Sequence, residues 1–171
     1  EQMKQLNNPD ARILFEQSEA SKLFGEYVEV PQGIKTGDDN RFRFKFWELP
    51  EKSTWRFYQS TPDSANKLFS GLSNILRWAN EGSELARKHG EFAWGKKGLA
   101  ISQMASMPYS YFTGEIQDSN INVIIPNNNI YLKQVVTYGI SLEFKEAVRQ
   151  LDQKLSVTNA TFKKVPFDLS Y

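Results

Sequence analysis

The segment 41–47 carries the most regular pattern of the sequence, because phenylalanine alternates along it with cationic or indole side chains. A β-strand points successive side chains to opposite faces, so an alternation of this kind predicts a strand. One face carries Phe42, Phe44 and Phe46, and the other carries Arg41, Arg43, Lys45 and Trp47. We therefore expect a strand with an aromatic face turned to the core and a cationic face turned outward.

Length and composition favour one ordinary globular domain, or one domain with a helical extension. The 171 residues are 40% hydrophobic and 24% charged, and they include twelve Phe, seven Tyr and four Trp, enough for a sizeable core. Zero cysteines exclude disulfides and thiolate metal sites, and the single histidine, His89, excludes a metal site with several histidine ligands. We expect no metal, and most hydrolytic sites are difficult to build from such a chain.

The sequence also favours a cytoplasmic location without a membrane partner. It has no apolar run of 18 residues, and Glu1-Gln2-Met3-Lys4 does not match the start of a signal peptide. The net charge of +1 is small, but residues 31–100 hold twelve basic and eight acidic side chains, a net of +4. A positive surface is therefore expected to come from this middle segment.

Local signals predict an α+β fold in which a mixed, mainly antiparallel sheet is flanked by helices. Strands are expected at residues 27–30, 41–47, 55–58, 75–78, 99–101, 109–113 and 121–125. Helices are expected at residues 64–69, 83–88, 129–138 and 141–155, after a first helix that Asp10 caps and that ends near Gly25. The expected cap of the last helix is Ser141, and its apolar face is Leu142, Val148, Leu151 and Leu155.

The loop 33–42 contains the most turn-prone stretch of the chain. Gly33 and Gly37 allow the backbone to turn sharply and to approach another surface closely. Asp38 and Asn40 can cap the turn by accepting hydrogen bonds from its amides. The cations that project from its two ends are Lys35 and Arg41. On these grounds alone, a tight surface connection that only satisfies its own backbone explains the loop equally well.

The same loop, Gly-Ile-Lys-Thr-Gly-Asp-Asp-Asn-Arg-Phe, resembles a family motif, Gly-x-x-Thr-Gly-Asp-Asn-x-x-Phe. That motif follows the catalytic domain in many bacterial adenine-N6 DNA methyltransferases, which include fused restriction–methyltransferase and phage-exclusion enzymes. Trp47 follows the motif, as a Trp often does in the family. Later segments are similar to family elements in the same order: 75–82, 98–102 with 110–112, and 131–132 through 159–162 with 165–167. The resemblance spans roughly residues 27–169.

In that family this region is the target-recognition domain, which reads the DNA site for restriction–modification or phage defence. The resemblance thus implies a DNA target-recognition domain at residues 27–171 and a helical lead-in from a catalytic domain at residues 1–26. It implies two partners, duplex DNA and the catalytic domain of the same parent polypeptide, which would use S-adenosylmethionine. The residues expected to contact DNA are Lys35, Thr36, Asp38, Asn40, Arg41, Arg43, Lys45, Lys96, Lys97 and Tyr111.

The chain departs from the family at several points. The family's Gly-Gly-x-Phe-x-x-Trp-Tyr-Gly stretch is matched only loosely by residues 64–71, and no Arg follows the Ser110 element in register. The catalytic motif that grips the target adenine is missing, since the nearest string is Asn7-Asn8-Pro9-Asp10. We expect no catalytic residue and no cofactor in this chain, and interpret it as the specificity portion of a larger enzyme.

Several of these residues, and the chain as a whole, also allow an interpretation other than DNA binding. Lys96 and Lys97, between two glycines, form either a phosphate clamp or a solvated hairpin tip. The cations of 41–45 lie along a DNA groove or protect an exposed strand from aggregation. For the whole chain, the rival is a protein–protein scaffold domain, since near-zero net charge and abundant aromatics also suit an interface. A small enzyme built on paired carboxylates is the third; its candidates are Asp38, Asp39, Glu48 and Glu51.

Overall fold

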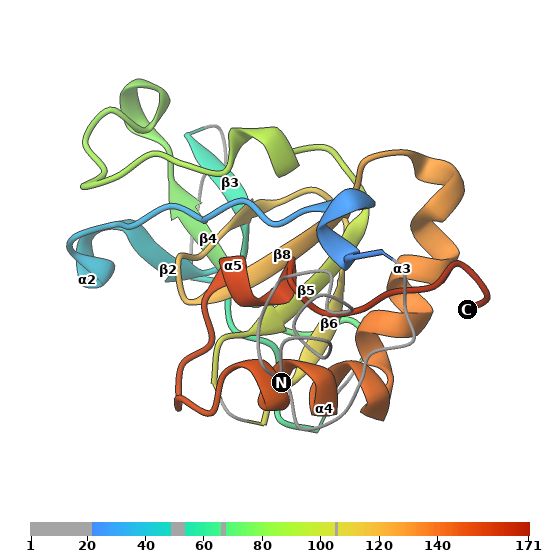
Figure 1. The fold of residues 1–171 in the computed structure, drawn as a ribbon. Helices are drawn as coiled ribbons and strands as arrows, with labels where there is room; N and C mark the ends of the chain where they lie inside the picture. Colours follow the sequence, from blue (N-terminus) through green and yellow to red (C-terminus); the bar gives the residue numbers. More distant parts are fainter. Residues whose placement is uncertain (1–21, 49–53, 66–67, 105) are drawn as a thin grey trace.

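Two four-stranded β-sheets form the framework of the protein, and helices cover one of them (Figure 1). The computed structural model describes residues 22–48, 54–65, 68–104 and 106–171, so the helix expected to begin at Asp10 lies mostly outside the described residues. At its expected end, Phe24–Glu26 forms a short 3-10 helix, η1. The predicted α+β class is confirmed, with two sheets in place of one.

The first sheet has the strand order β1-β8-β5-β6, and all its neighbouring strands are antiparallel. These strands are β1 (Val28–Glu29), β5 (Gly98–Ser102), β6 (Tyr109–Phe112) and β8 (Ile121–Pro126). Every residue of β5 and β8 is buried, which is typical of central strands covered on both faces. All four strands fall within or close to the segments predicted from the sequence.

Helices near the C-terminal end cover one face of the first sheet (Figure 1). They are η4 (Asn129–Tyr131), α3 (Leu132–Ile140), α4 (Leu142–Leu151) and α5 (Asn159–Phe162). Phe24 of η1 is fully buried among them, with its ring centroid 5.3 Å from that of Tyr138 and 5.7 Å from that of Phe144. A third ring, that of Phe167, lies 4.9 Å away. This cluster joins the first described residues to the end of the chain.

The second sheet has the order β2-β4-β3-β7. Its strands are β2 (Arg43–Lys45), β3 (Trp55–Gln59), β4 (Asn74–Arg77) and β7 (Ile116–Gln117). The β3–β7 pair is parallel and the other pairs are antiparallel. A separate core, made of Ile34, Phe42, Tyr58, Leu76, Leu85 and Ile116, packs on this sheet. Residues 118–120 connect β7 of the second sheet directly to β8 of the first sheet.

The strand predicted at 41–47 is shorter than expected, and its faces are reversed. Residues Asp39–Phe42 form a helical turn, α2, which Asp38 caps by accepting a hydrogen bond from Arg41 N at 3.2 Å. The strand therefore begins at Arg43, which pairs with Leu76, so Arg43 lies on the core side of the sheet. Phe42 is buried from α2 instead, and Phe46 is exposed. Because Asp38 caps a helical turn at residues 39–42, the strand starts at Arg43 and not at Arg41, where the alternation predicted its start.

Two predicted helices are absent from the described residues, and a third is shorter. In 64–69, Ser64 and Ala65 form a turn and residues 66–67 are not described. The 83–88 segment follows η2 (Ala79–Gly82), and its Arg87 instead bonds to the backbone of Lys35. The prediction for 141–155 is right about the Ser141 cap, but α4 ends at Leu151. Two members of its expected apolar face, Leu142 and Leu155, are exposed.

The Ser141 cap gives a direct stability prediction. Its Oγ accepts a hydrogen bond from Phe144 N at 3.0 Å, so Ser141→Ala is expected to lower the free energy of unfolding by about 1 kcal/mol. Ser83→Ala is the matched control, because Ser83 is exposed and precedes no helix; we expect its effect to be under about 0.5 kcal/mol. Urea denaturation followed by circular dichroism measures both, and equal losses would contradict the assigned cap.

Candidate nucleic-acid interface

The segment 33–37 is fixed by close backbone contacts. A Cβ on Gly33 would lie 2.3 Å from the carbonyl oxygen of Asp118, so only glycine fits here. The next residue, Ile34, donates from its N–H to Gln117 O at 2.9 Å, and Lys35 exchanges backbone hydrogen bonds with Arg87. Gly37 has a positive φ of 82°, where a side chain is strained. Gly33 and Gly37 thus serve the fold itself, the first by close approach to the β7 connection and the second by a sharp turn.

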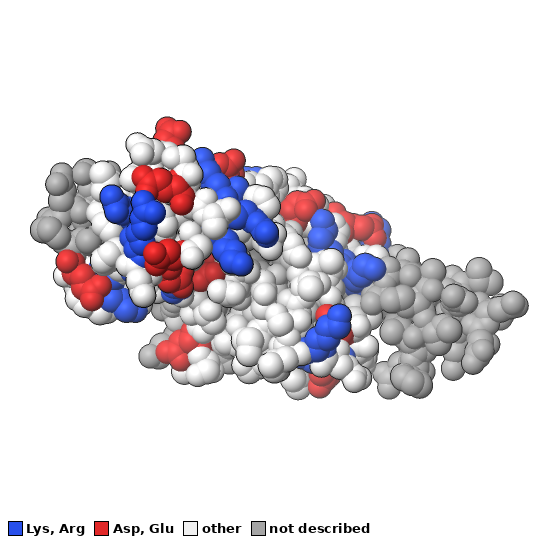
Figure 2. Space-filling view, turned by 90° about the vertical axis from the view of Figure 1, so that its left-hand side faces the viewer, with Lys and Arg blue, Asp and Glu red and all other residues white. Residues whose placement is uncertain are grey.

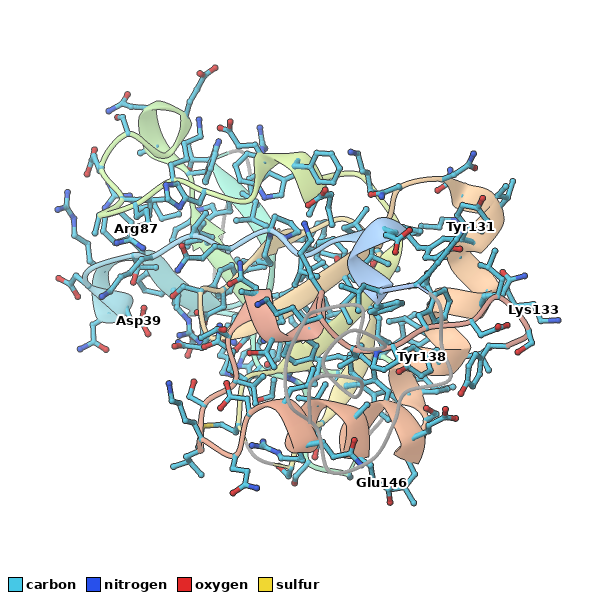
Figure 3. All side chains as sticks on the ribbon, in the orientation of Figure 1. Asp39, Arg87, Tyr131, Lys133, Tyr138 and Glu146 are labelled. Carbon is cyan, nitrogen blue, oxygen red and sulfur yellow. The ribbon has the colours of Figure 1, made fainter. Side chains whose placement is uncertain are left out.

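The polar residues of this segment mostly bond within the protein. Thr36 is only 7% exposed, and its hydroxyl donates to the Asp39 carboxylate. Arg41 forms an ion pair with Glu84. Asn40 is exposed on α2, and Figure 3 shows Asp39 at the same end of the molecule as Arg87. Of the cations here, Lys35 is exposed and has no ion pair among the described residues.

Arg43 is held by two carboxylates on the core side of β2. Its guanidinium donates to Asp39 Oδ2 at 2.7 Å and lies 3.6 Å from Oδ2 of the buried Asp118. It also lies over the ring of Tyr58, 5.3 Å from the centroid. Burial, and then the charge of Asp118, raise the pKa of Tyr58, so its phenol stays protonated. With one cation between two carboxylates, this cluster is not basic.

An open groove of about 740 Å³ lies beside this cluster, at the end of the second sheet. We call it the serine groove; its lining includes Arg43, Lys45, Phe46, Ser60, Thr61, Asp63, Phe69, Ser70, Ser73 and Asn74. Lys45 Nζ donates to Ser73 Oγ at 3.2 Å and has no carboxylate partner among the described residues. Phe69 is 63% exposed. The groove thus combines cations, the Asp63 carboxylate and exposed rings with many hydroxyl groups.

Tyr111 is connected to the serine groove through the segment 68–70. Its backbone N–H donates to Leu68 O at 2.8 Å, and Ser70 N donates to the buried hydroxyl of Ser110 at 2.9 Å. The rings of Tyr111 and Phe69 meet edge to face with centroids 5.5 Å apart. These contacts dock segment 68–70 on the edge of β6 and position Phe69 at the groove. Of the predicted residues, Arg43 and Lys45 thus line the groove together, and Tyr111 contacts it only through Phe69.

Lys96 and Lys97 lie in a different place, in the loop between η3 (Glu91–Ala93) and β5. In Figure 1 this loop and α2 lie on opposite sides of β8. Lys96 Nζ sits 3.2 Å from the centroid of the Phe92 ring, and Lys97 is exposed. The predicted cations therefore do not form one continuous surface.

The charge on the α2 side of the molecule is mixed. Figure 2 shows Lys and Arg interleaved there with Asp and Glu, next to an uncharged region. Pairs such as Arg41–Glu84 and Arg43–Asp39 account for part of this pattern.

No group of three or more His, Asp or Glu side chains suited to a metal ion occurs in the described part of the chain. No described helix is long and apolar enough to cross a membrane.

Comparison of the sequence with models of protein families finds no match. Comparison with curated proteins finds no similar sequence either.

Sequence reasoning missed most of the serine groove. Its hydroxyl and amide side chains come from residues 60–61 and 70–74, which are separated in sequence and carry no distinctive motif. Phe69 was part of an expected helix, where its ring would have been assigned to packing. The one available signal was the density of Ser and Thr around 60–73, which also suits plain loops.

Proposed function

We propose that this chain binds duplex DNA sequence-specifically, as the target-recognition portion of a bacterial adenine-N6 DNA methyltransferase. The S-adenosylmethionine and the catalytic residues belong, in this proposal, to a catalytic domain of the same parent polypeptide. The ordered motifs from residue 33 to residue 167 are one support. The other is the serine groove.

The observation that carries the proposal is the composition of that groove. Lys45 Nζ bonds to Ser73 Oγ and forms no ion pair among the described residues, so it is able to contact a phosphate; the nearby Glu48 carboxylate accepts instead from the Lys45 backbone N–H at 2.8 Å. Hydroxyl and amide groups of Ser60, Ser73 and Asn74 line the same groove, and such groups bond both to phosphates and to base edges. Arg43, in contrast, is neutralised by Asp39 and Asp118, so we assign it a structural role.

Binding of a random-sequence duplex, followed by fluorescence anisotropy, tests the electrostatic part of the proposal. Each phosphate contact is expected to lower the affinity about 3.5-fold between about 50 mM and 200 mM salt, because it releases counterions. Binding that is absent at the lower salt concentration would overturn the proposal.

Lys45→Ala locates the contact. We expect it to reduce the salt dependence by about one phosphate contact and to weaken binding of all duplexes alike. Lys133→Ala is the matched control, since Lys133 is exposed on α3, on the helical side of the molecule (Figure 3). Equal effects of the two substitutions would show that the serine groove is not the binding surface.

A protein–protein scaffold is the second candidate, and it has its own support. The exposed side chains Phe46, Trp47 and Phe69 and the mixed charges on the α2 side are typical of an interface. A scaffold predicts no duplex binding at any salt concentration, so the same titration separates the two functions.

A further inference from the structure

A second concave site lies on the opposite edge of the second sheet, away from the β2 edge. β7 pairs only with Tyr58 and Gln59, so the earlier part of β3 pairs with β4 on one side and has no described strand on the other. A notch of about 450 Å³ opens there, within the range of roughly 300–1,000 Å³ found for small-ligand sites. We call it the tryptophan notch; its lining includes Arg56, Phe57, Trp78, Trp94, Gly114 and Glu115.

Aromatic rings dominate the notch, and one of them is available for stacking. Trp78 and Trp94 meet edge to face with centroids 5.5 Å apart. Trp78 is already covered, by Gly82 on one side and by Lys88, whose Nζ lies 5.5 Å from its ring centroid. Phe57, however, is 72% exposed. Phe57 is therefore the ring of this site on which a planar ligand can stack.

The polar groups of the notch suit a ligand that is both a hydrogen-bond donor and an anion. Both oxygens of Glu115 accept from Thr113, Oε2 from its N–H at 3.2 Å and Oε1 from its hydroxyl, and each carboxylate oxygen can accept a further hydrogen bond. Arg56 makes only a long 3.5 Å contact to Trp55 O among the described bonds. A cation and a carboxylate beside an aromatic ring match the phosphate and the amino group of a nucleotide.

Further cations surround the notch. Gly95 N donates to Gly114 O at 2.9 Å, which holds the loop that carries Lys96 and Lys97 against the notch. Lys88 lies on the other side, paired with Glu91 at 3.1 Å. Apart from the Lys88–Glu91 pair, the notch and this loop hold the cations Arg56, Lys96 and Lys97 against the Glu115 carboxylate, so an anionic ligand is favoured over a cationic or neutral one. This excess distinguishes a nucleotide from an apolar peptide, which the open strand edge also accommodates.

We propose that the tryptophan notch takes one unstacked nucleotide of a nucleic acid. Its base stacks on Phe57, its amino group donates to Glu115, and its phosphate meets Arg56 and the Lys96–Lys97 loop. The inference rests on the proposed function and extends it, since the notch and the serine groove lie on different edges of the sheet. It also gives the Lys96–Lys97 loop a role that the groove does not.

The test compares two short labelled duplexes by fluorescence anisotropy, one fully paired and one with a single bulged adenine. The bulged duplex is expected to bind about tenfold more tightly, because stacking of one base on an aromatic ring contributes about that much. Phe57→Ala is expected to abolish this preference, and Glu115→Gln to reduce it. Leu142→Ala, which removes another exposed apolar side chain, should leave the preference unchanged.

Each outcome distinguishes the two proposals. Equal binding of both duplexes, or a preference that survives Phe57→Ala, overturns the nucleotide inference, leaves the proposed function intact and makes an extended peptide the better occupant. Failure to bind either duplex overturns both. Lys45→Ala should weaken binding of both duplexes while preserving the ratio between them.

Discussion

Replacing Gly33 by alanine is expected to lower the free energy of unfolding by about 3 kcal/mol, which is a large effect for a single substitution in a connecting segment. The new Cβ would lie 2.3 Å from Asp118 O and 2.4 Å from Gln117 O. Both are backbone atoms of the β7 connection, so no side chain can rotate away. Urea denaturation followed by tryptophan fluorescence measures the loss as a lower midpoint with an unchanged slope.

Gly95→Ala is the control for this substitution. Gly95 has a positive φ of 74°, unlike Gly33, and nothing lies within 4 Å of its would-be Cβ. It therefore reports only the cost of a left-handed backbone, about 1 kcal/mol. If Gly33→Ala cost no more than Gly95→Ala, the close contact between segment 33–34 and Asp118 would be wrong.

Phe24→Ala is expected to destabilise the protein by about 4 kcal/mol, the range found for buried phenylalanine. The ring is fully buried and touches the rings of Tyr138, Phe144 and Phe167. Its removal leaves a cavity where η1 meets α3, α4 and the C-terminal tail. Thermal and urea unfolding both measure this loss.

Phe57→Ala removes the same ring from an exposed position, so its cost is expected to stay below about 1 kcal/mol. This comparison also establishes that the Phe57 variant used in the DNA experiment is folded. Comparable losses at the two positions would mean that the assignment of Phe24 to the core, or of Phe57 to the surface, is incorrect.

The fold was predictable where a strand is buried on both faces or a helix has a clear cap. The apolar run of β8 and the Ser141 cap of α4 are local signals, and both predictions are confirmed. The predicted start of the 41–47 strand was wrong, because Asp38 caps a helical turn over residues 39–42 in spite of the alternation of Phe and Arg. The helix expected at 83–88 failed because Arg87 pairs with Lys35, a contact between segments some fifty residues apart.

The candidate site was predictable only in part, because its cations depend on tertiary partners. The sequence identified Arg41 and Arg43 as cations, but Glu84 and Asp118, which neutralise them, are distant in sequence. Phe57 and Phe69 had no pattern that separates a surface ring from a core ring. Lys45 is the predicted cation that combines a groove position with the lack of a described carboxylate partner.

We propose that this chain provides the DNA sequence specificity of a larger enzyme. Selection of bound duplexes from a random pool tests this proposal most directly. The purified chain is incubated with duplexes of random sequence at low salt, and the bound fraction is amplified and sequenced over several rounds. The account predicts enrichment of one short motif that contains an adenine. A bound fraction with the composition of the starting pool would contradict it.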